Sequence, residues 1–88
     1  MLSVSEKKII AECARKYNVA SVYVFGSSAS SREYNDIDLG VKGIEQEKFF
    51  KFYGELIDSL SKPVDLVDLS DKTLFTKLVE KEGVRIYG

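Results

Sequence analysis

The sequence predicts an α/β fold of the α+β type, a small mixed β-sheet of about three to four strands with helices packed on it. Apolar residues recur at helical spacing in separate segments, and short runs rich in β-branched and aromatic residues lie between them. Glycine, proline, asparagine and serine separate the two kinds of segment. Because 88 residues leave room for one small domain, we expect a single domain over residues 1–88.

The helices are predicted from apolar stripes and from residues that cap helix ends. Ser3 or Ser5 can cap the first helix, because a serine hydroxyl accepts a hydrogen bond from a first-turn amide. The longest helix is expected over residues 44–60, and the last one is expected to be capped by Ser70 or Asp71. The stripe of the last helix consists of Leu74, Phe75, Leu78 and Val79.

The strands are predicted from alternating or β-branched runs that end at turn residues. The expected strands are residues 20–25, 36–41 and 64–69, residues 84–87 are compatible with a short final strand, and residues 29–32 form a short helical turn.

The helix over residues 44–60 carries more aromatic surface than one thin core absorbs. Its predicted apolar stripe consists of Phe49, Tyr53, Leu56 and Leu60, widened by Phe50 and Ile57. The aromatic residues of this helix are Phe49, Phe50, Phe52 and Tyr53. Since exposed apolar patches usually mark interfaces, we expect a partner protein and a hetero- or homo-oligomer.

Composition and charge exclude several classes of protein. Hydrophobic residues make up 44% and charged residues 31%, which excludes disordered, collagen-like and coiled-coil chains. With 13 basic and 14 acidic residues the net charge is −1, so we expect no direct DNA binding. One cysteine and no histidine exclude a disulfide framework and a histidine base. Apolar runs are too short for a membrane span and no signal peptide is evident, so we expect a soluble, cytoplasmic protein.

Two carboxylates on one predicted strand indicate a cation site. Asp36 and Asp38 are separated by one residue, so strand alternation places both on the same face. Their mutual repulsion is relieved by a divalent cation, and Mg²⁺ prefers oxygen ligands. Asp65 lies in an otherwise apolar run and joins this pair if the two strands are neighbours. The alternatives are an exposed strand face for the pair and an edge-strand surface position for Asp65.

A glycine–serine turn precedes the aspartate pair. Gly26 permits a tight turn with positive φ, and the amides that follow it can bind an anion. The Ser27 hydroxyl can donate to a phosphate oxygen. Alone this pattern is an ordinary turn, but together with one or two metal ions it suits a nucleoside triphosphate.

These motifs together resemble a known family. Residues 26–29, 35–39 and 64–67, and the ending over residues 82–87, are similar to the minimal nucleotidyltransferase branch of the DNA polymerase β-like superfamily. The family pattern is Gly-Ser-x-Ala-Arg-Gly, then Ser-Asp-x-Asp, then a third Asp on a later strand. The resemblance covers nearly the whole chain and implies the polymerase β-like fold.

The resemblance implies magnesium-dependent transfer of a nucleoside monophosphate, AMP from ATP, to a hydroxyl. Asp36 and Asp38 would bind the metal ions, Asp65 would complete the cluster and help to activate the acceptor, and Gly26 and Ser27 would hold the phosphates. Many minimal members are antitoxins whose partner is a HEPN-type ribonuclease toxin. Some of them add AMP to a tyrosine of that toxin.

The chain departs from the family pattern after the alanine. Ser30 and Ser31 replace the Arg-Gly pair, and Arg32 is a candidate to contact the phosphates in place of the missing arginine. Tyr34, near the aspartate pair, can stack on a base. The departures favour a second hypothesis, a catalytically weak antitoxin that neutralises its partner by binding alone. A third is a subunit that acts on a small molecule or RNA with a separate substrate-binding protein.

Overall fold

The computed structural model describes residues 1–88 and contains one four-stranded sheet in the order β3-β2-β1-β4. Strand β1 is antiparallel to β2 and β4, whereas β2 and β3 are parallel. The predicted small mixed sheet is therefore confirmed, and the short final strand is part of it. In chain order the elements are α1 (Val4–Lys16), β1 (Ser21–Phe25), α2 (Ser27–Ser30), β2 (Ile37–Lys42), α3 (Gln46–Ser59), β3 (Val64–Asp68), α4 (Leu74–Glu82) and β4 (Val84–Tyr87).

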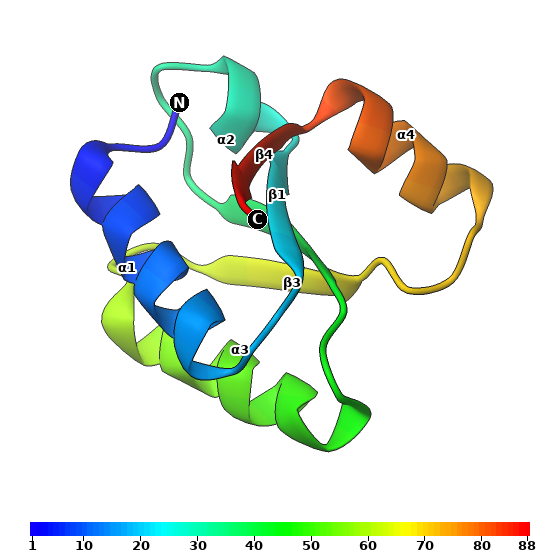
Figure 1. Cartoon of the computed structure of the whole chain (residues 1–88). Helices are drawn as coiled ribbons and strands as arrows, with labels where there is room; N and C mark the ends of the chain where they lie inside the picture. Colours follow the sequence, from blue (N-terminus) through cyan, green and yellow to red (C-terminus); the bar gives the residue numbers. More distant parts are fainter.

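The two faces of the sheet have different chemistry, because successive side chains of a strand point to opposite faces. Helices α1 and α3 lie side by side on one face (Figure 1) and close a single apolar core over it. The strand residues of this core are Val22, Val24, Ile37, Leu39, Val41, Val64 and Leu66. The opposite face carries Phe25, Asp38 and Asp65, and only α4 and the segment before it cover part of that face.

Helix α1 begins as predicted, with Ser3 as its N-cap. The Ser3 hydroxyl accepts a hydrogen bond from the Glu6 amide (3.1 Å), and the Ser3 amide donates to the Glu6 carboxylate (2.8 Å). This capping box satisfies two amides that the helix leaves unpaired. Glu6 is buried and also accepts a hydrogen bond from the Tyr34 hydroxyl, while the Lys62 ammonium lies 3.7 Å away.

The apolar face of α3 differs from the predicted stripe. Phe52 and Leu56 are fully buried, whereas Phe49 and Tyr53 are half-buried. Phe50 is 78% exposed, so the prediction that it widens the core-facing stripe is wrong; Ile57 is likewise exposed. Compared with the prediction, helix α3 is rotated about its axis so that Phe52 faces the sheet. The sequence could not predict this rotation, because several neighbouring aromatic residues are equally apolar.

Two other predicted boundaries shift. Helix α4 is capped by Thr73, whose hydroxyl accepts from the Thr76 amide (3.1 Å), not by Ser70 or Asp71. Its buried residues are Thr76 and Val79, so most of the predicted stripe remains at the surface. The short helix α2 begins directly after Gly26 rather than at Ala29. None of the helices is both long and apolar enough to cross a membrane.

Candidate active site

Strand pairing brings two of the predicted site residues together. Asp38 on β2 is the register partner of Asp65 on β3 and of Phe25 on β1. Register partners point to the same face and neighbouring strands are about 4.8 Å apart, so the two carboxylates lie side by side. Asp36 lies immediately before β2 rather than within it. The row Asp65–Asp38–Phe25 therefore crosses three strands on the face opposite the core.

The electrostatics of Asp38 agree with this crowding. Burial raises the pKa of the Asp38 carboxyl above its ordinary value, and the charges of Asp65 and Asp36 raise it further. No hydrogen-bond donor within the chain offsets this repulsion at the Asp38 carboxylate. Oxygen ligands of this kind are those that Mg²⁺ prefers, so the chemistry of the donor set fits a divalent cation. As the side chains lie, however, no three of them form a group that would hold a metal ion.

The glycine–serine turn lies directly against Asp38. Gly26 has φ 68°, and a Cβ atom there would lie 2.6 Å from Oδ2 of Asp38. Any other residue would both strain the backbone and collide with the carboxylate. Ser27 follows as the first residue of α2 and is exposed. Gly26 and Asp38, twelve residues apart in the chain, are thus neighbours.

Ser28 connects the turn to β2, a role that sequence reasoning missed. Its side chain is fully buried, and its hydroxyl donates to the Phe25 carbonyl (2.9 Å) and accepts from the Asp38 amide (3.1 Å). These two bonds tie the end of β1 to the residue that carries the central carboxylate. Nothing in the local sequence distinguishes Ser28 from Ser27 or Ser30, so only the fold reveals this role.

Two other residues, Arg32 and Tyr34, were predicted to contact the nucleotide. Arg32 is exposed in the loop after α2 and forms no ion pair within the chain. The hydroxyl of Tyr34 is bonded to Glu6, and Lys62 lies 3.9 Å from the centre of its ring. The interpretation of Tyr34 as a base-stacking residue is therefore wrong, because both its ring and its hydroxyl are occupied.

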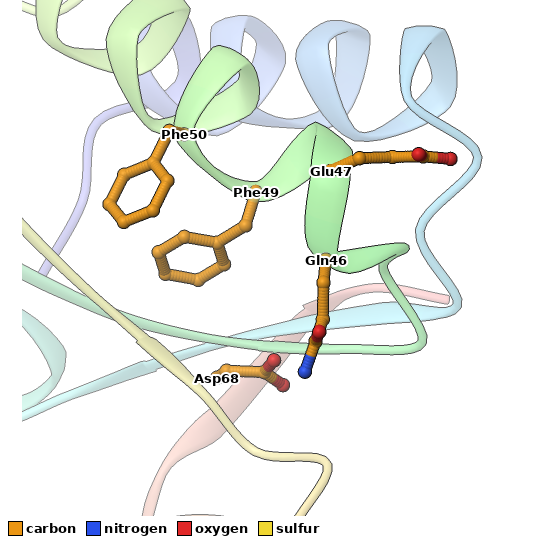
Figure 2. Close-up of a pocket in the computed structure, with 5 residues that line it drawn as sticks. All are labelled: Gln46, Glu47, Phe49, Phe50 and Asp68. Carbon is orange, nitrogen blue, oxygen red and sulfur yellow. The ribbon is translucent and has the colours of Figure 1, made fainter.

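The largest cavity is not at the aspartates. It measures about 500 Å³ and lies between the start of α3 and the end of β3, where Figure 2 shows Phe49 and Phe50 side by side and Gln46 directed toward Asp68. Asp68 is three residues beyond Asp65 and so points to the other face of the sheet. Its carboxylate accepts from the Ser70 amide (2.9 Å), which is a turn contact.

Solved structures of toxin–antitoxin complexes share this fold. A toxin–antitoxin with AMP-PNP is 26% identical over 93% of this chain and 73% of that chain, with a TM-score of 0.77. A tri-AMPylated Shewanella oneidensis HEPN toxin in complex with MNT antitoxin is 27% identical over 96% of this chain and 71% of that chain, with a TM-score of 0.74. An MntA–HepT toxin–antitoxin is 24% identical over 98% and 73%, with a TM-score of 0.74, which supports the fold alone.

The structural neighbours of this chain are therefore MNT antitoxins in complex with HEPN toxins. A comparison with curated protein sequences finds no match. The family model described as "Polymerase beta, Nucleotidyltransferase" matches residues 7–88, almost the whole chain. This match, with the mixed sheet and the row of aspartates beside a glycine–serine turn, shows that the chain belongs to the polymerase β nucleotidyltransferase family.

Proposed function

We propose that this protein transfers AMP from ATP to a hydroxyl, a tyrosine of a partner HEPN toxin, and acts as the antitoxin to that toxin. The observation that carries the proposal is the register pair Asp38–Asp65 beside Gly26. The similar structures that contain AMP-PNP and an AMPylated toxin support the choice of nucleotide and acceptor.

The proposed reaction needs three functions that the chain's residues can divide between them. Gly26 and Ser27 hold the triphosphate, and Arg32 is available to approach it from its exposed loop. Asp65, at the edge of the row, accepts the proton of the acceptor hydroxyl. The acceptor oxygen then bonds to the α-phosphorus, the bond to the bridging oxygen breaks, and pyrophosphate leaves.

Asp36, Asp38 and Asp65 are the residues that would hold Mg²⁺. When bound, the cation neutralises charge on the phosphates and on the oxygens that attack and leave. The role of the chain is to supply carboxylates at a fixed place. The β2–β3 register sets the spacing of Asp38 and Asp65, and the Ser28 hydrogen bonds set the distance from Asp38 to the turn.

The direct test is to incubate the protein with Mg²⁺, labelled ATP and the product of the adjacent gene. Label is expected on a tyrosine of the partner and is expected to be lost in Asp36→Asn/Asp38→Asn. Asp68→Asn is the matched control, because Asp68 is on β3 but faces away from the site. Absence of transfer with each of the four nucleoside triphosphates would refute the proposal.

A binding-only antitoxin is the second candidate, and two observations favour it. Ser30 and Ser31 occupy the positions where the family has Arg-Gly. In addition, no three acidic side chains lie close enough together to hold a metal ion. Protection of cells from the partner separates the two candidates. If Asp36→Asn/Asp38→Asn still protects, the protein acts by occlusion; if protection is lost while the complex still forms, the protein acts by nucleotide transfer.

A further inference from the structure

A second cleft borders the glycine–serine turn on the side away from Asp65. It has a volume of about 410 Å³ and lies between α2 and α4. Its walls include Phe25, Gly26, Phe75, Leu78 and Glu82. The rings of Phe25 and Phe75 meet edge to face, with centroids 5.8 Å apart. Aromatic walls and a volume in this range are typical of small-molecule sites.

The position of this cleft indicates that it binds the nucleotide rather than the acceptor tyrosine. The sheet order places Asp65, Asp38 and Phe25 next to one another in that sequence on one face. In the proposed reaction the acceptor hydroxyl lies next to Asp65, at one end of this row. The cleft begins at the other end, at Phe25 and Gly26. A ligand that occupies both the turn and the cleft must carry phosphates and a flat apolar group, which describes a nucleotide and not a tyrosine side chain.

The exposure of the wall residues supports the same assignment. Phe75 is 49% exposed and Leu78 is 51% exposed, although both belong to the helix that packs on the sheet. Neither side chain is needed to fill the core, since α4 is anchored by Val79 and Thr76. Glu82 adds the only charged group of the wall, a carboxylate that can accept from an amino group.

We propose that this cleft is the nucleobase subsite, in which Phe75 stacks on the purine ring and Glu82 accepts from its exocyclic amino group. The assignment rests on the proposed function for the place of the phosphates. In addition, Phe75 would make the protein bind ATP more tightly than a triphosphate without a base. Glu82 would distinguish adenine from a purine that lacks the amino group.

The test compares the Mg²⁺ complexes of ATP and inorganic tripolyphosphate as ligands of the isolated protein, by calorimetry. Wild type should bind ATP more tightly than tripolyphosphate. Phe75→Ala should weaken ATP binding roughly 10-fold or more, the range of a base–aromatic stack, and leave tripolyphosphate binding unchanged. Phe75→Leu keeps apolar volume without the ring and should weaken ATP binding similarly. Because both variants lose the edge-to-face contact with Phe25, each is measured well below its own melting temperature, where it is folded. Leu74→Ala is the matched control, because Leu74 is 85% exposed on the same helix and outside the cleft.

Glu82 has its own arm of the experiment. Wild type should prefer ATP over purine riboside triphosphate, which lacks the amino group, and Glu82→Ala should remove that preference. Equal affinity of wild type for ATP and tripolyphosphate, or an equal loss of both in Phe75→Ala, would overturn the proposal. The proposal would also be overturned if Phe75→Ala bound ATP normally but needed a higher concentration of the partner for transfer. The cleft would then hold the acceptor and not the base. If Phe75 governs ATP binding but no AMP reaches any partner, the subsite stands and the proposed transfer fails.

Discussion

The two faces of the sheet show how one set of strands serves two purposes. The face under α1 and α3 consists of fully apolar strand residues in one continuous core. The other face has Asp38 and Asp65 in register, with a carboxylate whose pKa is raised by burial and by its acidic neighbours. The first face stabilises the fold, and the repulsion between the carboxylates on the second face destabilises it. Variants of the two faces should therefore have opposite effects.

The largest expected effect is on the apolar face. Phe52→Ala removes a fully buried ring between α3 and the sheet and should lower the free energy of unfolding by about 3–5 kcal/mol. Phe50→Ala, two residues earlier and 78% exposed, should change it by less than about 0.5 kcal/mol. Urea unfolding of both variants measures the difference. Similar losses would mean that α3 faces the sheet as its predicted stripe does.

The next effect concerns the hydrogen bonds that join the two halves of the site. Ser28→Ala leaves the part-buried Asp38 amide without its partner and should cost about 1–3 kcal/mol. The proposed transfer of AMP should slow as well, because Asp38 loses its connection to the turn. Ser30→Ala is the control, since Ser30 is exposed. Equal behaviour of the two variants in thermal melts and transfer assays would contradict the role assigned to Ser28.

The third prediction contrasts two carboxylates with different surroundings. Burial alone would raise the pKa of Glu6, but hydrogen bonds from Tyr34 and Ser3 and the charge of Lys62 outweigh it, so the pKa is lowered. A lowered pKa contributes stability above the ordinary value of 4.5, and this contribution is lost as the pH falls below it. Glu6→Gln should cost about 1 kcal/mol at neutral pH and reduce the acid sensitivity between pH 5 and 3, roughly the window of this linkage. Chemical denaturation across that window is the measurement, and an unchanged pH profile would contradict the assignment.

The smallest effect has the opposite sign. Asp38→Asn removes a charge from the row and should raise the free energy of unfolding by up to about 1 kcal/mol in the absence of divalent cations. Adding Mg²⁺ should raise the melting temperature of wild type but not of Asp38→Asn. The control Asp68→Asn should respond to Mg²⁺ as wild type does. Destabilisation by Asp38→Asn in chelator would show that the carboxylate is structural.

Much of this molecule was predictable because its signals are local. The cap at Ser3, the positions of the strands and the alternation around Asp38 depend on near neighbours in the chain, and the structure confirms them. The grouping of Asp38 with Asp65 was conditional on two strands being neighbours, and the parallel β2–β3 register satisfies that condition. The metal-binding and phosphate-binding roles of Asp36, Asp38, Asp65, Gly26, Ser27 and Arg32 stay predictions.

The errors share a physical cause. Phe49, Phe50, Phe52 and Tyr53 are equally apolar, so only contact with the sheet selects Phe52 as the buried ring. Ser27, Ser28 and Ser30 are identical in type, and only the fold places the hydroxyl of Ser28 between a carbonyl and an amide. Tyr34 is next to the aspartates in sequence, but a distant Glu6 binds its hydroxyl.

The sequence by itself determined the element types, the order of the acidic residues and the glycine needed at position 26, since these depend on backbone preferences and short-range spacing. Tertiary structure alone decided which aromatic ring enters the core, which serine joins the turn to β2, and which cleft lies beside the turn. Those outcomes depend on contacts between residues far apart in the chain, where several side chains of the same type compete for one place.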